Sequence, residues 1–246
     1  MPFPLAHPAA ILPLRRWCPA YLDFSALVTG SLTPDLASSI DDWEYFSHTI
    51  PGSFLFCLPV GLVTLWIFQR VRAPLVATFP NPHRDALLPL CGGAPASLFR
   101  VIISLLLGSW LHIAWDLFTH DYSWLVRRFA VFSAPVAGMP LNHVLWLVSS
   151  LAGVGFLLAM YRSLLHKRSS DLGTAAPPDR RAYALWSGIL LIPFAGAAPL
   201  ALHNAGPSYS ASTLTRYLAM YDLGCTYLTL AFAGLFFSWR QAARNR

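Results

Sequence analysis

The sequence predicts an all-α protein, a polytopic transmembrane helix bundle of about five spans that follows a short N-terminal helix too short to span. Three observations lead to this fold class. Of the 246 residues, 56% are hydrophobic and only 11% are charged, whereas soluble domains carry about 25% charged residues. Five segments approach the roughly 20 predominantly apolar residues that a membrane-spanning helix needs. Nine tryptophans and nine tyrosines are typical of the aromatic belts at membrane interfaces.

Residues 1–49 differ from the rest and are interpreted as an extramembrane or interfacial segment that carries candidate metal ligands. The apolar stretch Leu22–Leu32 is too short to span and predicts a buried or interfacial helix. Asp35 follows Pro34 just after this stretch, where a side chain can project from a helix end. The segment is rich in ionisable groups: His7, Asp23, Asp35, Asp41, Asp42, Glu44 and His48.

Residues 50–240 are predicted to form the transmembrane bundle. The first span is short and is expected to include residues 50–53, and Pro193 and Pro199 are expected to kink the fourth without breaking it. Two connectors, Ala73–Ala96 with five prolines and Ser169–Arg181, are predicted to be loops. The expected spans are Phe54–Phe68, Val101–Thr119, Val144–Tyr161, Tyr183–Leu202 and Tyr217–Trp239.

The basic residues predict an orientation for the five spans. In the five-span arrangement, the first loop, the third loop and the C-terminal tail share one face, and they carry 12 of the 17 Lys and Arg residues. The other face carries five. Because cytoplasmic loops carry the excess of positive charge, we expect the N-terminus outside and residues 241–246 as a basic cytoplasmic tail. Six of the eight histidines then fall on the outer, less positive face, which predicts a layer of polar side chains there.

The segment HIAWDLFTH in the second span contains the strongest local pattern. His112 and Asp116 are four residues apart, so they share one helix face about 6 Å apart along the axis and can bind one zinc ion together. His120 lies about 12 Å from His112 along the same axis. It can join the pair only if the helix unwinds after Thr119; otherwise Asp116 bridges two metals or His120 supports another ligand. The alternative is that His112 and Asp116 simply satisfy each other as a buried pair.

Four segments, MPFPLAHPAAILPLRR, SLTPDL, EYFSHT and LHIAWDLFTH, resemble an uncharacterised family of bacterial integral membrane proteins (domain of unknown function 4184) over most of the chain. More distantly, the order His, Pro-Asp, His, His-x3-Asp resembles predicted membrane-bound metal-dependent hydrolases, and zinc-dependent phospholipase C also uses a helical His-x3-acid pair. The resemblance implies a multi-pass protein of the bacterial inner membrane. The metal ligands that it implies are His7, Asp35, His48, His112 and Asp116, with His120 as a further candidate.

The chain departs from these patterns at three places. Ala37 stands where the hydrolases have a second acid, and His48 in SHT lacks the His-Arg pair that precedes it in them. Trp146 stands where the nearer family is expected to have a polar residue. The smaller number of ligands disfavours a complete two-metal site and leaves a one-metal site open.

The leading hypothesis for function is a metal-dependent hydrolase that acts at the outer membrane interface on a lipid or a small phosphoester. The expected cofactor is a divalent metal, zinc by its ligands, and Asp35 or Glu44 is the expected general base. The expected partner is the lipid bilayer; no nucleic acid is expected, and the sequence contains no phosphate-binding glycine loop or dinucleotide fingerprint. The alternative is a non-catalytic scaffold or small transporter in which His and Asp form a structural pair.

Overall fold

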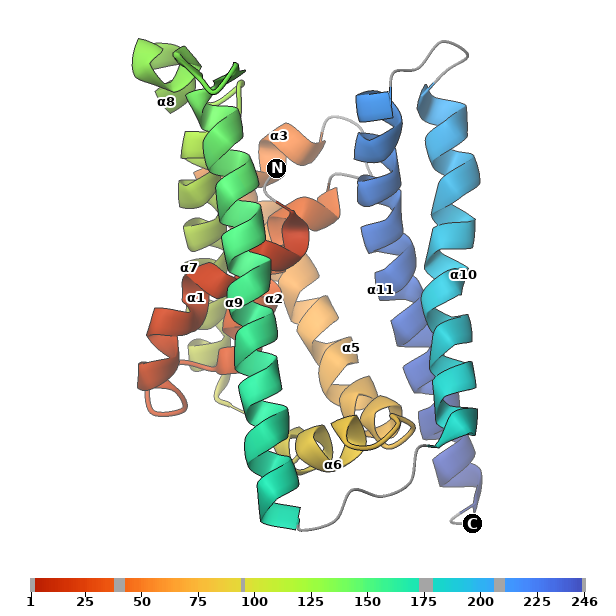
Figure 1. Ribbon diagram of the computed structural model, residues 1–246. Coiled ribbons are helices and arrows are strands. Elements are labelled where there is room, and N and C mark those ends of the chain that lie inside the picture. The colour runs from red at the N-terminus through yellow and green to blue at the C-terminus, as the bar shows by residue number, and fades with distance from the viewer. Residues whose placement is uncertain (1–2, 38–42, 94–95, 173–178, 206–210, 245–246) are drawn as a thin grey trace. The chain divides into compact units, whose positions relative to one another are not determined.

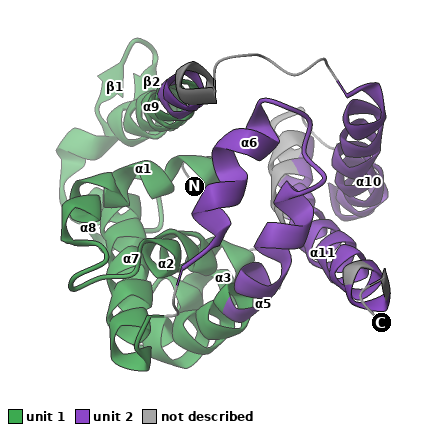
Figure 2. Cartoon of the chain, turned by 90° about the horizontal axis from the view of Figure 1, so that it is seen from below, with its two compact units in different colours: residues 1–65, 95–162 green, residues 66–94, 163–246 purple. Residues whose placement is uncertain are grey.

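The computed structural model describes residues 3–37, 43–93, 96–172, 179–205 and 211–244 (Figure 1). These residues are almost entirely helical, and their strands form one small antiparallel ribbon, β1 (Pro135–Val136) with β2 (Met139–Pro140). The predicted all-α fold class is confirmed. The chain divides into two compact units, unit 1 with residues 1–65 and 95–162, and unit 2 with residues 66–94 and 163–246 (Figure 2).

Unit 1 contains the N-terminal segment and the helices that carry the candidate metal ligands. A series of short helical turns leads into α2, and α7 and the first part of α9 complete the unit. Its elements are η1 (Pro4–Ala6), α1 (Pro8–Ile11), η2 (Leu12–Trp17), α2 (Phe24–Leu36), α3 (Trp43–Ser47), α4 (Ile50–Gly52), the π-helical η4 (Ser53–Cys57), the start of α5 (Leu58–Val76), α7 (Leu98–Thr119), α8 (Trp124–Arg128), η6 (Ala130–Ser133), β1, β2 and the larger part of α9 (Leu141–Leu172).

Helices α2 and α7 approach each other so closely that only glycine fits at the crossing. A Cβ atom on Gly30 would collide with the carbonyl oxygen of Leu105, and one on Gly108 would collide with that of Leu27. Small residues at such crossings let the backbones of membrane helices touch. The contact brings the C-terminal half of α2, which carries Asp35, against α7.

The ends of α2 and α7 decide where their acidic and imidazole groups lie. Asp23 starts α2, because its Oδ1 accepts a hydrogen bond of 2.7 Å from the backbone N–H of Ala26. The helix runs through Pro34 to Leu36, so Asp35 lies in its last turn and not after its end as predicted. Helix α7 ends at Thr119, and His120 has an extended backbone. The helix therefore unwinds after Thr119, which was the predicted condition for His120 to approach His112 and Asp116.

Four of the predicted spans are confirmed as helices of membrane-crossing length and apolarity. The candidate spans are longer than predicted: Ile50–Val76, Leu98–Arg128, Leu141–Arg168 and Arg180–Ala205. The second includes α7, the break after Thr119 and α8. The first begins at Ile50, as expected, and runs without a break through α4, η4 and α5. The fifth predicted span lies within α11 (Ala211–Arg244), which is not among these four, so its crossing stays a prediction, as does the orientation in the membrane.

Both predicted loops are partly helical. Helix α5 continues through Pro74 to Val76, and α6 (His83–Leu87) and η5 (Leu88–Cys91) follow in the proline-rich segment. A proline removes one backbone hydrogen bond, which a helix packed among others tolerates. Helix α9 extends to Leu172, because the polar residues after Ser169 include no helix breaker before Gly173. Residues 173–178 lie outside the described part of the chain.

Unit 2 contains the end of α5, α6, η5, the end of α9 and a pair of long helices, α10 (Arg180–Ala205) and α11. The indole N–H of Trp186 in α10 donates to the carbonyl oxygen and the hydroxyl of Thr78, both at 3.2 Å, and its ring packs edge-on against Phe79. Helix α11 includes residues 241–244 of the predicted tail, and Pro193 and Pro199 lie inside an unbroken α10.

Candidate metal centre

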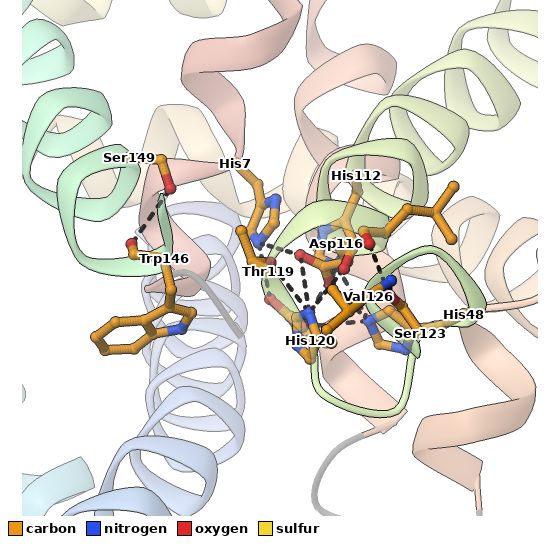
Figure 3. Close-up of polar contacts among 12 residues, drawn as sticks. His7, His48, His112, Asp116, Thr119, His120, Ser123, Val126, Trp146 and Ser149 are labelled. Carbon is orange, nitrogen blue, oxygen red and sulfur yellow. Dashed lines mark hydrogen bonds and ion pairs between the residues drawn. The ribbon is translucent and has the colours of Figure 1, made fainter. Parts of the chain in front are cut away.

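Four side chains from separate parts of unit 1 meet inside the protein. Asp35 comes from the last turn of α2, His48 follows α3, and His112 and Asp116 come from α7. One nitrogen or oxygen atom of each lies within 4.8 Å of one atom of every other. Figure 3 shows His48, His112 and Asp116 turned toward one another, with His7 and His120 beside them. Five of the six predicted ligands are buried and His48 is nearly so.

Five of the six separations among the four ligand atoms are close to those of a tetrahedral zinc site. The Nε2 atoms of His48 and His112 are 3.2 Å apart. Asp116 Oδ2 is 3.2 Å from His48 Nε2 and 3.1 Å from His112 Nε2, and Asp35 Oδ1 is 3.7 Å and 3.5 Å from the same two atoms. Ligands about 2.0–2.1 Å from a tetrahedral ion lie about 3.3 Å from one another. The geometry therefore suits a single zinc-sized cation without a large rearrangement.

Backbone carbonyl groups determine which ring nitrogens face this centre. The Nδ1 atom of His112 lies 2.7 Å from the carbonyl oxygen of Ser31, and that of His48 lies 2.7 Å from the carbonyl oxygen of Glu44. A carbonyl oxygen only accepts, so both Nδ1 atoms carry hydrogen and donate it. In the neutral rings each Nε2 then presents a lone pair to the centre, which is the form in which histidine binds a metal.

His7 brings a third imidazole to the opposite side of the two carboxylates. Its ring is stacked on that of His112, with centroids 3.7 Å apart. Its Nε2 lies 3.8 Å from Asp116 Oδ1 and 3.9 Å from Asp35 Oδ2. The chain start is held in place by a hydrogen bond of 2.9 Å from the backbone N–H of Phe3 to Ser150 Oγ on α9. His7, which on its own position in the sequence is more typical of a loop histidine, is thus buried in the cluster.

His120 approaches Asp116 through the break at the end of α7. Its Nδ1 lies 3.1 Å from the carbonyl oxygen of Asp116 and 3.7 Å from Asp116 Oδ1. Because Nδ1 donates to the carbonyl oxygen, Nε2 is left as an acceptor. The break after Thr119 therefore brings His120 to the side of Asp116 that also faces His7.

The cluster holds an unusual number of buried polar atoms that lack a hydrogen bond. Within the described residues, no hydrogen-bond partner is found for His7 Nε2, His120 Nε2 or any of the four carboxylate oxygens of Asp35 and Asp116. The oxygens face histidine nitrogens at ion-pair distance, but not in hydrogen-bond geometry. Buried polar atoms in folded proteins are normally paired, so this concentration in one place fits a bound cation.

Burial and the carboxylates act in opposite directions on the imidazoles outside the spans. Burial lowers the pKa of His48, but the neighbouring Asp116 and Asp35 outweigh it and raise the pKa to about 9. Burial also lowers the pKa of His7, and with the added effect of His112 the value falls to about 4. Burial alone would raise the pKa of Asp35, but the adjacent His112 holds it below its ordinary range.

The remaining predicted residues have different environments. Glu44, predicted as a base, is half-buried on α3, and its carbonyl oxygen binds His48; the role of its carboxylate stays a prediction. Asp41 and Asp42 lie outside the described residues. Trp146 lies on α9, and its indole ring points away from the cluster (Figure 3). A tryptophan in place of the polar residue expected at this position therefore does not displace the candidate ligands.

The sequence did not predict two sets of polar contacts. The first orients the imidazoles of the centre. The carbonyl groups of Ser31, Glu44 and Asp116 orient three imidazoles, and no side-chain pattern can reveal a backbone group. The second is a neighbouring pair outside the centre: Asp121 lies 3.0 Å from His143 Nε2 and accepts a hydrogen bond of 2.7 Å from Asn142. The position of Asp121 directly after His120 could have indicated a further ligand. Its side chain is exposed, however, and pairs with His143 instead.

An apolar groove adjoins the cluster at His7. Its volume is about 580 Å³, within the range of about 300–1,000 Å³ of small-molecule sites. The groove runs between the N-terminal turns, α7 and α9, and His7 is part of its wall. The other lining residues are Ala6, Ala9, Ala10, Trp115, Leu145, Val148, Ser149, Ala152, Gly153 and Phe156.

Comparison with known proteins gives a family and no activity. Residues 1–236 match the family described as Domain of unknown function (DUF4184), and the chain belongs to that family. No curated protein and no solved structure matches the chain.

Proposed function

We propose that this member of the DUF4184 family is a membrane-embedded, metal-dependent hydrolase that cleaves a phosphoester of lipid type at the membrane interface. The observation that carries the proposal is the near-tetrahedral set of Asp35 Oδ1, His48 Nε2, His112 Nε2 and Asp116 Oδ2. Imidazole lone pairs and carboxylate oxygens that face one point repel one another unless a cation binds them.

The donor set favours zinc. Two imidazoles and two carboxylates at tetrahedral spacing suit Zn²⁺, and Mn²⁺ is the next candidate for a site rich in oxygen ligands. If an ion held by these four residues takes a water as a fifth ligand, it lowers the pKa of that water toward about 7 and polarises a phosphoryl oxygen. Because Ser31 and Glu44 orient the imidazoles through their carbonyl groups, the ligands are positioned before an ion arrives.

The groove supports a substrate with an apolar chain. His7 is one of the residues that line the groove, and its Nε2 faces both carboxylates. A molecule lying in the groove would therefore have one end near the centre. In the hydrolysis, a water oxygen bonds to phosphorus and the bond from phosphorus to the leaving oxygen breaks. The water proton passes to a base, and the leaving oxygen takes up a proton to become an alcohol.

Of the two residues predicted as the general base, Asp35 and Glu44, the contacts favour Glu44. Both oxygens of Asp35 face imidazole nitrogens, which supports a ligand role for Asp35. Glu44 is half-buried and lies one helical turn before His48, so it is the better candidate for the base.

The alternative function, a scaffold or small transporter with a structural His–Asp cluster, is favoured by one observation. The pKa of His48 is raised to about 9 by Asp116 and Asp35 against the opposing effect of burial. A protonated imidazole between two carboxylates is a stable arrangement without any metal. The two functions differ in metal content and in the effect of removing His112.

The deciding experiment combines metal analysis with an assay of phosphoester hydrolysis. The full chain is purified in detergent without chelators, and its zinc and manganese are measured by elemental analysis. Hydrolysis is followed with a long-chain lipid phosphodiester in mixed micelles. We expect bound metal and product release in the wild type, and loss of both in His112→Ala and Asp116→Ala.

The matched control is His143→Ala, because His143 pairs with Asp121 at 3.0 Å but is exposed and outside the centre. This variant should retain metal and activity. A folded wild-type protein that binds no divalent ion, or one whose metal content is unchanged by His112→Ala, would refute the hydrolase and support the structural cluster.

A further inference from the structure

We infer that the centre binds two divalent cations bridged by the carboxylates of Asp35 and Asp116, and that the second ion, on the His7 side, keeps an open coordination position. The inference rests on the proposed function, because it needs the cation site. It specifies how many ions bind, which residues hold each and which ion meets the substrate.

The two carboxylates divide their oxygens between two sides. Asp116 directs Oδ2 toward His48 and His112, at 3.2 and 3.1 Å, and Oδ1 toward His7 and His120, at 3.8 and 3.7 Å. Asp35 does the same: Oδ1 faces His48 and His112 at 3.7 and 3.5 Å, and Oδ2 faces His7 at 3.9 Å.

A carboxylate that presents one oxygen to each of two groups of imidazoles is placed to bridge two ions. Two ions bridged in this way lie about 3.5–4 Å apart, the spacing of known two-metal hydrolytic sites. One ion among Asp35, His48, His112 and Asp116 would leave four buried atoms of the cluster without a partner among the described residues. One is His120 Nε2, and the other three, His7 Nε2, Asp35 Oδ2 and Asp116 Oδ1, lie on the His7 side. A second ion satisfies all three.

The two positions differ in the number of protein ligands. The first ion has four: two imidazole nitrogens and two carboxylate oxygens. The second has His7 Nε2, Asp35 Oδ2 and Asp116 Oδ1. Sites with four protein ligands are typically structural, whereas three leave a position for water or substrate. The second ion is therefore the one that meets the substrate, and its ligand His7 also lines the apolar groove.

His120 lies on the side of the second ion but is assigned a different role. Its Nδ1 is bound to the carbonyl oxygen of Asp116 at 3.1 Å, which leaves a buried Nε2 without a partner in the described part of the chain. We assign His120 as a positioning residue whose Nε2 accepts a hydrogen bond from a water molecule at the open position of the second ion. The helix break after Thr119 allows this placement.

The test is the number of manganese ions bound per chain. The full-length protein is stripped with a chelator, loaded with Mn²⁺, freed of unbound ion and measured by elemental analysis and by electron paramagnetic resonance. We expect two ions per wild-type chain with the spectrum of an exchange-coupled pair. In His7→Ala we expect one ion per chain and the six-line spectrum of an isolated Mn²⁺, while His143→Ala keeps two.

The outcomes separate this inference from the proposed function. One ion per wild-type chain with an isolated signal overturns the two-cation centre and leaves the hydrolase proposal in place. No bound ion overturns both. Two ions that remain in His7→Ala overturn the assignment of the second position. Because the wild-type stoichiometry is decisive alone, the test stands even if His7→Ala does not fold.

Discussion

At the scale of single residues, the centre depends on hydrogen bonds that its imidazoles donate away from it. His48 donates Nδ1–H to the carbonyl oxygen of Glu44, and His112 donates to that of Ser31, each at 2.7 Å. These bonds select the tautomer whose Nε2 binds metal and fix the ring orientation. The carbonyl groups belong to α2 and α3, so the local backbone determines the chemistry of the side chains.

A first prediction concerns proton release on metal binding. The pKa of His48 is about 9 and that of His7 is about 4, so at pH 7 His48 carries a proton that a cation must displace, and His7 does not. We expect Zn²⁺ binding at pH 7 to release the His48 proton and His7 to contribute none. The affinity should increase as the pH rises toward about 9, and above that value both the proton release from His48 and its effect on the affinity should disappear.

Calorimetric titration of the protein with Zn²⁺ in buffers of different ionisation enthalpy measures this release directly. The contribution of His48 is isolated by comparing pH 7 with pH 10. Equal proton release at the two values would contradict the protonated state of His48.

A second prediction concerns the base. Glu44→Gln preserves the backbone carbonyl that binds His48, so the metal content should not change. If the carboxylate takes the proton of the attacking water, kcat should fall by about 10²–10⁴-fold, the usual contribution of a general base, while KM changes little. Steady-state kinetics on the metal-loaded protein tests this, and an unchanged kcat would exclude Glu44 as the base.

The residue scale also shows what the sequence could predict of the site. The spacing of His112 and Asp116 predicted a shared helix face, and their atoms are 3.1 Å apart. The resemblance implied His7, Asp35 and His48, and all three join the pair. The split of each carboxylate between two sides was not predictable, because it depends on side-chain rotation and on the crossing of α2 and α7.

At the scale of helices, the contact between α2 and α7 positions the centre. Gly30 and Gly108 allow the two backbones to touch, and one residue after Gly30 the carbonyl oxygen of Ser31 accepts the hydrogen bond from His112. The same crossing places Asp35, one turn later in α2, within 3.5 Å of His112. The separation of these helices therefore determines both the orientation of an imidazole and the distance to its carboxylate.

A third prediction follows for Gly108→Ala. The added methyl group would overlap the carbonyl oxygen of Leu27 and force the helices apart, at a cost of about 1–3 kcal/mol, as for other overpacked interiors. We expect a lower thermal unfolding temperature in detergent and weaker zinc binding, because Ser31 and Asp35 move away from His112. The control is Gly155→Ala on α9, where nothing lies within 4 Å of the added carbon. Unfolding temperatures that fall equally in both variants would contradict a special role for the crossing.

Helix ends were harder to predict than helix existence. The apolar segment before Asp35 predicted α2, but the helix includes Pro34 and ends at Leu36. Pro74 likewise lies inside α5. Packing among neighbouring helices compensates for the hydrogen bond that a proline removes, and a single sequence does not reveal those neighbours.

At the scale of the whole molecule, every predicted metal ligand belongs to unit 1. The residues come from four segments that are far apart in the chain: the N-terminal turns, the end of α2, the residue after α3 and the C-terminal half of α7. Composition and hydropathy predicted a helical membrane protein, but they carry no information on which helix ends meet. The match to the DUF4184 family over residues 1–236 includes all of these segments.

The last prediction concerns the apolar groove, which joins the N-terminal turns, α7 and α9 beside His7. If it holds the acyl chain of the substrate, a bulky side chain at Ala152 should exclude long-chain phosphodiesters. Each buried methylene contributes about 0.8 kcal/mol, so the loss of several should lower kcat/KM for a long-chain substrate by at least about 100-fold in Ala152→Phe. A short-chain, water-soluble phosphodiester should be hydrolysed nearly as well as by the wild type, and the metal content should not change. The matched control is Leu151→Phe, because the neighbouring Leu151 is exposed and does not line the groove. Equal losses for short and long chains in Ala152→Phe would show that the variant disturbs the centre through His7, and the groove would then lose its assignment as the site of the acyl chain.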